Sequence, residues 1–181
     1  MNLSRLRKLV LVVVVVTLGL GASQSAWGGY QEGLDAARKG DFATALREWN
    51  PLAEQGNANA QSSLGLMYAR GQGVPQDDKT AAKWFTLAAK QGHARAQFNL
   101  GLMYHNGQGV PQDYKTALKW YTLAAAQGYA DAQLDLVLRY ARAQGVIQDN
   151  VYAHMWWNIA ASTGEEEAIK SRGIVAEKKT P

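Results

Sequence analysis

The chain of 181 residues contains no cysteine, which excludes disulfide bonds, thiolate zinc sites and a cysteine nucleophile. Strand signals are absent too, because the only run of β-branched residues lies within residues 9–20. Aromatic residues, in contrast, make up 9% of the chain and include six tryptophans, enough to supply a folded core. The chain therefore has to fold without covalent cross-links and lacks the pattern of a β protein.

The first thirty residues have the three parts of a secretory signal peptide. Three basic residues among the first eight precede an apolar stretch over 9–20, and small residues follow over 21–26. The apolar stretch is shorter than the roughly 20 residues that a spanning helix needs. We therefore expect residues 1–26 to be a signal peptide cut between residues 25 and 28, with an uncleaved membrane anchor as the alternative. A cleaved chain is predicted to be periplasmic or secreted.

Most of the excess positive charge belongs to this leader. The whole chain has 19 Lys and Arg against 15 Asp and Glu, a formal net charge of +4. Three basic residues and no acidic residue precede residue 27, so the mature chain would carry 16 basic and 15 acidic residues, a net charge of +1. No basic stripe remains, and nucleic acid is therefore not an expected partner.

Beyond the leader, four series of residues recur with a step of 36. They are the glycines Gly56, Gly92, Gly128 and Gly164, the aspartates Asp41, Asp77, Asp113 and Asp149, the alanines Ala45, Ala81, Ala117 and Ala153, and the aromatic residues Trp49, Phe85, Tyr121 and Trp157. Four series in one register predict an array of repeated structural units.

Each unit has the pattern of two helices joined by a loop. In the first helix, Ala60, Leu64 and Met67 are spaced as the buried stripe of an amphipathic helix. Asp77 is placed to cap the second helix, which ends at Gly92. Because one pair cannot bury its own aromatic face, we predict an all-α fold, a right-handed α-solenoid of stacked antiparallel helix pairs.

The run from Ala96 to Asp113, AQFNLGLMYHNGQGVPQD, resembles a Sel1-like repeat, a relative of the tetratricopeptide repeats with a longer loop between its helices. The resemblance covers residues 58–93, 94–129 and a divergent third repeat, 130–164. Residues 29–57 resemble a shorter tetratricopeptide-like pair, and residues 165–181 resemble part of a C-terminal capping helix. The resemblance implies an interaction scaffold rather than an enzyme.

The residues that carry the repeat signature are helix glycines, N-cap aspartates, and the alanines, tryptophans and terminal glycines of the second helices. They are Gly65, Gly101, Asp77, Asp113, Asp149, Ala81, Ala117, Ala153, Trp84, Trp120, Trp156, Gly92, Gly128 and Gly164. Because the tryptophans are interpreted as core, we expect Trp120→Ala to cost about 3–5 kcal/mol and to unfold the array.

The third repeat departs from this signature at three positions. Val137 replaces the helix glycine, Ala143 replaces the glycine that caps the first helix, and Ile147 replaces the loop proline. A glycine lets the helices of a pair approach closely, so Val137 is expected to hold its pair slightly apart.

No residue pattern favours catalysis or metal binding. The G-Q-G triplets at 71–73 and 107–109 lack the preceding strand of a dinucleotide-binding loop, so they are interpreted as turns. His93, His105 and His154 have no metal-ligand spacing. The S-x-x-K, S-D-N and K-T-G motifs of β-lactam hydrolases are absent. We predict no catalytic residues, no metal and no cofactor.

A binding surface is expected on the concave face, which the first helices line in tetratricopeptide-like arrays. Opposite the buried stripe of these helices lies an apolar stripe with a polar rim, formed by Ser62, Leu66, Arg70, Phe98, Leu102, His105, Asn106, Leu134, Leu138 and Arg142. Such a groove suits another protein or a peptide. The alternative is that this stripe packs against the neighbouring first helix and leaves nothing to bind.

Two other functions stay open. Recognition of cell-wall glycan, or regulation of a cell-wall enzyme, would use exposed aromatic side chains, for which Tyr114, Tyr129 and Tyr152 are the candidates. A hydrolase, the third possibility, has no residue constellation to support it. The membrane would be contacted only through an uncleaved leader.

Overall fold

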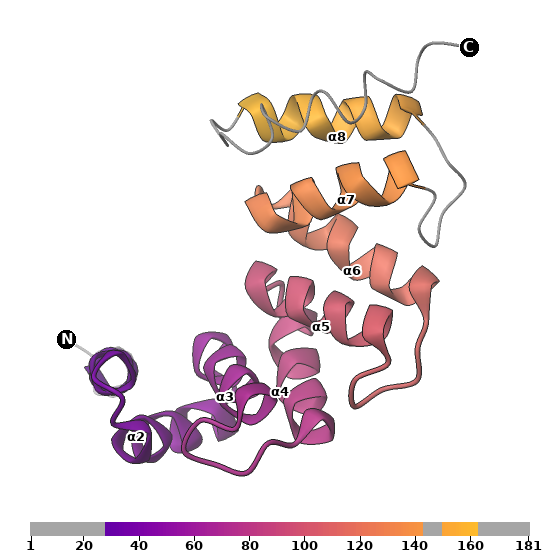
Figure 1. Cartoon of the computed structure of the whole chain (residues 1–181). Coiled ribbons are helices and arrows are strands. Elements are labelled where there is room, and N and C mark those ends of the chain that lie inside the picture. The colour runs from indigo at the N-terminus through magenta and orange to yellow at the C-terminus, as the bar shows by residue number, and fades with distance from the viewer. Residues whose placement is uncertain (1–27, 143–149, 163–181) are drawn as a thin grey trace, which may run out of the picture.

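The computed structural model describes residues 28–142 and 150–162, in which every regular element is a helix. A helix over residues 28–38 precedes α2 (Phe42–Glu54), α3 (Ala58–Arg70), α4 (Asp78–Lys90), α5 (Ala94–Asn106), α6 (Tyr114–Ala126), α7 (Ala130–Arg142) and α8 (Asn150–Ser162). Figure 1 shows the helices following one another along a curved path, each packed on its neighbours in the chain. The all-α solenoid expected from the sequence is confirmed.

Several sequence-based expectations lie outside the described residues. They concern the signal peptide, the segment 143–149 with Ala143, Ile147 and Asp149, the terminal Gly164 and the segment 165–181. The side chains of Arg142, Tyr152, Ala153, His154 and Trp157 lie outside the described part as well. Within the described residues, no helix is long and apolar enough to cross a bilayer.

Side chains at the start of each repeat's helices fix where those helices begin. In α4, Oδ1 of Asp77 accepts hydrogen bonds from the backbone N–H groups of Lys79 and Thr80 at 2.9 and 3.1 Å. The hydroxyl of Thr80 also donates to this carboxylate, and these hydrogen bonds lower the pKa of Asp77. Asp113 caps α6 in the same way. The two aspartates therefore act as the N-caps that the sequence predicts.

The N-cap of α5 is a histidine, His93, where α3 has Asn57. Nδ1 of His93 accepts a hydrogen bond from the backbone N–H of Ala96 at 3.2 Å, and its Nε2 lies 3.1 Å from Oδ1 of Asn59. Burial lowers the pKa of His93, and the nearby Arg95 lowers it further. Because only a neutral imidazole nitrogen can accept this hydrogen bond, the cap requires unprotonated His93.

We expect the free energy of unfolding to fall as the pH is lowered below about 6.5. A pKa that is lower in the folded chain means that the unfolded chain binds more protons, so the stabilisation is present above the unfolded pKa and is lost as the pH falls through the folded pKa. His93→Asn gives α5 the same N-cap residue that α3 has, and asparagine does not titrate in this range. The variant should therefore flatten the pH dependence of the free energy of unfolding, measured with urea between about pH 5 and 8. His105, whose pKa is also lowered, should contribute the remaining slope. An unchanged slope in His93→Asn would contradict the assignment.

The two adjacent aromatic residues of α4, and likewise those of α6, pack in different clusters. Phe85 and Tyr121 are buried in the clusters between pairs, whereas Trp84 and Trp120 are half-buried and pack against the preceding cluster. Consecutive residues of an α-helix point about 100° apart, so both cannot face one cluster. Both tryptophans thus pack against the core, as expected of core residues, but of the three signature tryptophans only Trp156 is buried.

Glycines in the first helices make room for these aromatic rings. A Cβ atom on Gly65 would lie 2.7 Å from the ring of Phe85, and one on Gly101 would lie 2.8 Å from the ring of Tyr121. Val137, the equivalent residue of the third repeat, is fully buried. Its expected effect on the spacing of its helix pair stays a prediction, because the side chain of Trp157, which corresponds in sequence to Phe85 and Tyr121, is outside the described part.

A hydrogen-bonded relay of glutamines, one buried and one exposed in each unit, joins successive pairs. Nε2 of Gln97 donates to the carbonyl of Ala89 at 3.2 Å, and its Oε1 accepts from Nε2 of Gln127 at 2.7 Å. Gln61 and Gln91 make the same arrangement one repeat earlier. A buried amide needs such partners, so the relay fixes how one pair sits on the next.

The loop after each first helix lies against the second helix of the preceding pair. Gly109 has a φ of +68°, and a Cβ atom there would lie 2.1 Å from the carbonyl oxygen of Asp78 at the start of α4. Gly73 has a φ of +72° and meets Phe42 at the start of α2 in the same way. The G-Q-G triplets are therefore turns, and each second glycine also permits a close approach between neighbouring pairs.

Candidate functional site

Two pockets open among the first helices, which form what we call the first-helix face (the helix over 28–38, α3, α5 and α7). The N-terminal pocket, about 270 Å³, lies between the helix over 28–38 and α3 and is lined by Leu34, Ala37, Arg38, Phe42, Trp49, Ser63, Leu66, Met67, Arg70, Gln72 and Arg95. The central pocket, about 200 Å³, lies between α3 and α5 and is lined by Leu66, Ala69, Arg70, Asp78, Phe85, Asn99, Leu102, Met103 and Gln108.

The two pockets are equivalent positions of successive repeats. Met67 and Gln72 of the N-terminal pocket are followed 36 residues later by Met103 and Gln108 of the central pocket. Leu66 and Arg70 line both pockets, since α3 lies between them. A single extended partner could therefore occupy both.

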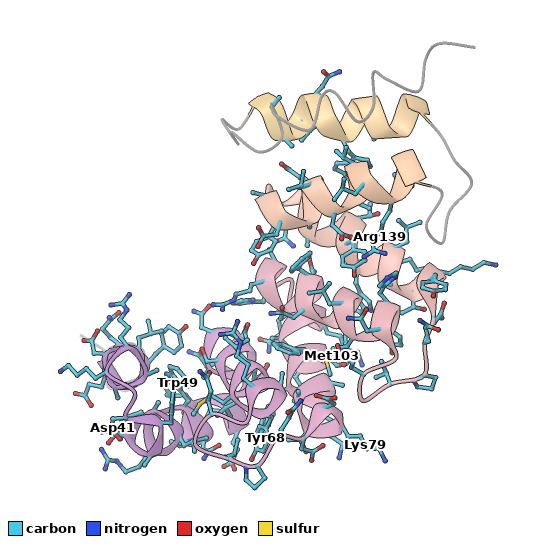
Figure 2. All side chains as sticks on the ribbon, in the orientation of Figure 1. Asp41, Trp49, Tyr68, Lys79, Met103 and Arg139 are labelled. Carbon is cyan, nitrogen blue, oxygen red and sulfur yellow. The ribbon has the colours of Figure 1, made fainter. Side chains whose placement is uncertain are left out.

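The N-terminal pocket combines an apolar floor with arginines at its rim. Trp49, labelled in Figure 2, is buried at the floor, where its Nε1 donates to the carbonyl of Tyr30 at 3.2 Å. Arg38 forms an exposed ion pair with Asp35 at 3.3 Å. Arg70 and Arg95 are exposed, and neither forms an ion pair with a carboxylate in the described part of the chain.

At the third equivalent position, between α5 and α7, side chains fill the space that forms a pocket in the earlier repeats. Arg139 stands there in place of Met67 and Met103, and it is only 7% exposed (Figure 2). Its guanidinium pairs with Asp135, donates to Nδ1 of His105 at 2.7 Å, and lies 4.6 Å above the ring of Tyr121. In the third repeat, a buried and ion-paired arginine therefore takes the place of the methionine that lines each of the two pockets.

The charges of this filled position affect the neighbouring titratable groups. Burial raises the pKa of Tyr121. Burial also lowers the pKa of His105, and the positive charge of Arg139 lowers it further. Both groups are thereby kept neutral, so the buried charges are those of Arg139 and its partner Asp135.

Replacing this ion pair by the residues of the second repeat should leave the chain at least as stable. Asp135→Asn alone leaves Arg139 without its counter-ion and should cost about 1–3 kcal/mol, less than a fully buried pair because Asp135 is half-buried. The double variant Arg139→Met with Asp135→Asn reproduces Met103 and Asn99, and it should recover that loss. Urea unfolding of the three proteins tests this, and a double variant weaker than Asp135→Asn would contradict it.

The structure separates the predicted site residues into two groups. Leu66, Arg70 and Leu102 line the pockets, and Asn106 is exposed at the end of α5. Leu134 and Leu138 are half-buried on α7, beside the filled position. Arg142 is the last residue of α7, and its side chain is outside the described part.

Three of the predicted site residues serve packing instead. Ser62 is 5% exposed and so cannot contact a partner. Phe98 lies between the rings of Tyr121 and Tyr129, at centroid distances of 5.7 and 5.4 Å. His105 is held by Arg139. These three side chains therefore serve packing, as in the alternative interpretation of this stripe, and His105 is held by a residue of the next repeat.

The N-terminal pair contributes pocket residues that the repeat pattern of the sequence does not reveal. Arg38 corresponds to Arg70 when Gly33 is aligned with Gly65, and a Cβ atom on Gly33 would lie 2.2 Å from Trp49. Because the loop of the first pair is shorter, its residues do not follow the step of 36 that relates the other repeats.

Other features of the described residues give weaker support for a functional site. Tyr114 is 44% exposed, with its ring 5.0 Å from that of His105, whereas Tyr129 packs on Phe98. No group of three His, Asp or Glu side chains in this part of the chain could hold a metal ion. Exposed leucines recur on the second helices as Leu87 and Leu123, on the surface we call the second-helix face.

The model of the Sel1 repeat matches residues 58–93, 94–129 and 130–164. This chain belongs to the Sel1 repeat family. Sel1 repeat proteins are in general protein-interaction scaffolds and typically non-catalytic. The resemblance found in the sequence is confirmed.

Two solved structures resemble this Sel1 repeat protein. A Sel1 repeat protein from Oxalobacter formigenes is 32% identical with a TM-score of 0.73, over 78% of this chain and 58% of that one. The protective antigen c5321 of uropathogenic Escherichia coli, which displays an SLR fold, is 36% identical with a TM-score of 0.75, over 87% of this chain and 36% of that one. This chain thus spans 58% and 36% of their lengths. A comparison with curated proteins finds no match.

Proposed function

We propose that this Sel1 repeat protein is a non-catalytic scaffold of the cell envelope that binds a partner protein or peptide on its first-helix face. The signal-peptide pattern of residues 1–26 supports export. The family supports a protein partner. The choice of the first-helix face as the binding surface is supported by the two equivalent pockets, which lie side by side and share Leu66 and Arg70.

The size of the pockets is the observation that carries this proposal. Pockets for small molecules usually enclose about 300–1,000 Å³ and bury most of the ligand. At about 270 and 200 Å³, both pockets of the first-helix face fall below this range, and each has room for an anchor side chain. Two such pockets one repeat apart suit successive anchor side chains of one polypeptide segment.

Site-specific cross-linking tests this proposal. A photoreactive amino acid at Gln108, which is exposed and lines the central pocket, should cross-link a discrete partner in cells that produce the protein. The matched control places the same amino acid at Leu123, which is 48% exposed on the second-helix face, and should give no such adduct. The same adducts at both positions, or none at Gln108, would refute binding on the first-helix face.

Export is tested separately by mass spectrometry of the protein from a periplasmic extract. The mature N-terminus should follow a cut between residues 25 and 28. A chain that keeps Met1 and fractionates with the membrane would support the uncleaved anchor instead.

A further inference from the structure

We propose that the N-terminal pocket selects a polypeptide segment in which an apolar side chain is flanked by carboxylates, and that Arg70 and Arg95 bind those carboxylates. This inference rests on the proposed function and goes beyond it by naming the chemistry of the partner segment. It places the specificity of the scaffold at its N-terminal end.

The floor of the N-terminal pocket sets the requirement for an apolar anchor. Five apolar residues supply it: Leu34, Phe42, Trp49, Leu66 and Met67. The helix over 28–38 forms one wall and α3 the other, and Trp49 of α2 closes the bottom. A cavity of about 270 Å³ with these walls takes one large aliphatic or aromatic side chain, whose burial would drive binding.

The rim of the same pocket sets the requirement for negative charge. Arg38, Arg70 and Arg95 come from three different helices and converge on the opening. Asp35 already pairs with Arg38, so the uncompensated guanidinium groups are those of Arg70 and Arg95. No acidic residue is among the described residues that line this pocket. A guanidinium binds a carboxylate through two parallel hydrogen bonds, which makes a carboxylate the fitting group at this rim.

Comparison of the pockets within the molecule shows that the positive rim is specific to the N-terminal one. In the central pocket, Asp78 occupies the place of Phe42 and supplies a negative charge beside Arg70. In the third position, Asp135 neutralises Arg139. Of these three positions, only the N-terminal pocket has positive charge at its rim without a neighbouring negative charge to balance all of it. The excess charge therefore comes from the residues of this pocket and does not follow from the fold.

A recessed pocket also argues for a polypeptide over an anionic membrane surface. The apolar residues lie below the arginines, so a flat bilayer would reach the rim without filling the floor. An acidic side chain next to an apolar one on a single segment reaches both. Binding to lipid vesicles is therefore the outcome that would favour a different partner.

The test uses three fluorescein-labelled peptides and the full-length mature protein. Each peptide has a central leucine, flanked on both sides by pairs of glutamate, glutamine or lysine. By fluorescence anisotropy at low salt, the glutamate peptide should bind about tenfold more tightly than the glutamine peptide, and the lysine peptide more weakly still. The preference should shrink as the salt concentration rises, because both arginines are exposed to solvent.

Two double variants, each with two positive charges removed from a different face, separate binding at the N-terminal pocket from a general attraction of the acidic peptide to positive charge. Arg70→Gln with Arg95→Gln should reduce the preference for glutamate over glutamine to within about twofold. Lys83→Gln with Lys119→Gln removes the same charge from exposed residues of α4 and α6, away from the pocket, and should leave the preference unchanged. Circular dichroism confirms that both double variants keep their helices.

The outcomes distinguish this inference from the proposed function. If no peptide binds, if the arginine variant keeps the preference, or if the lysine variant loses it equally, the inference is overturned. Tight binding to phosphatidylserine vesicles without binding of the glutamate peptide overturns it as well. Cross-linking of a partner at Gln108 would still support the scaffold in each of these cases, so the two claims fail separately.

Discussion

Tyr121→Ala is expected to lower the free energy of unfolding by about 3–5 kcal/mol. The ring is fully buried in the cluster between the second and third repeats, with Gly101 against one side and Arg139 above it. Truncation leaves a cavity and removes the hydroxyl that accepts from Nη2 of Arg139 at 3.2 Å. Because each repeat is stabilised by its neighbours, this loss should lower the melting temperature of the whole array.

Two variants control for this result. Tyr121→Phe keeps the ring and removes only the hydroxyl, so it should cost a fraction of the loss, about 1–2 kcal/mol. Trp120→Ala removes a larger but half-buried side chain and should cost less than Tyr121→Ala, in contrast to the expectation from the sequence. A larger loss in Trp120→Ala than in Tyr121→Ala, measured by urea unfolding, would show that the tryptophan is the main core residue after all.

Gly109→Ala is expected to cost about 2–5 kcal/mol, the second largest effect. The residue has a φ of +68°, which an L side chain rarely adopts, and the added Cβ atom would lie 2.1 Å from the carbonyl oxygen of Asp78. That oxygen belongs to the backbone of α4 and cannot rotate away. The loop between α5 and α6 would therefore have to leave the preceding pair.

Gly128→Ala is the matched control for this substitution. Its φ is +82°, but no atom lies within 4 Å of the position that a Cβ atom would take. It should therefore show only the conformational cost, about 1–2 kcal/mol. Equal losses in the two variants, measured by thermal and urea unfolding, would mean that the contact between loop and helix contributes nothing to stability.

The repeat architecture is predictable from the sequence because local chemistry repeats in a fixed register. Asp77 and Asp113 cap helices through their own side chains, and Gly71 and Gly107 end helices in the left-handed conformation that glycine favours. These features depend on neighbours within a few residues. The order of helices follows from them, and stacking follows from the need to bury the aromatic residues.

The candidate site was harder to predict because it depends on contacts between repeats. The helical stripe that contains Ser62, Leu66 and Phe98 looks uniform in sequence, yet the first and last of these are covered by packing and only Leu66 lines a pocket. Helical periodicity gives the direction of a side chain on its own helix and says nothing of how far the next helix covers it.

The filled third position also depends on contacts between repeats that the sequence does not reveal. An alignment of the repeats reveals Arg139 in place of Met103 and Asp135 in place of Asn99. It does not reveal that His105, from the preceding repeat, accepts a hydrogen bond from this arginine. Only the packing of α7 on α5 and α6 brings these groups together, and this packing determines where the pockets end.

The loops that carry Gly73 and Gly109 have a consequence for how the chain is assembled. Each lies on the start of a second helix that precedes it in the chain, α2 for Gly73 and α4 for Gly109. A ribosome makes the helix first and the loop that covers it later. The contacts of each of these helix pairs are therefore complete only when the loop of the following repeat has packed on it, so the stability of a pair depends on the repeat that comes after it in the chain.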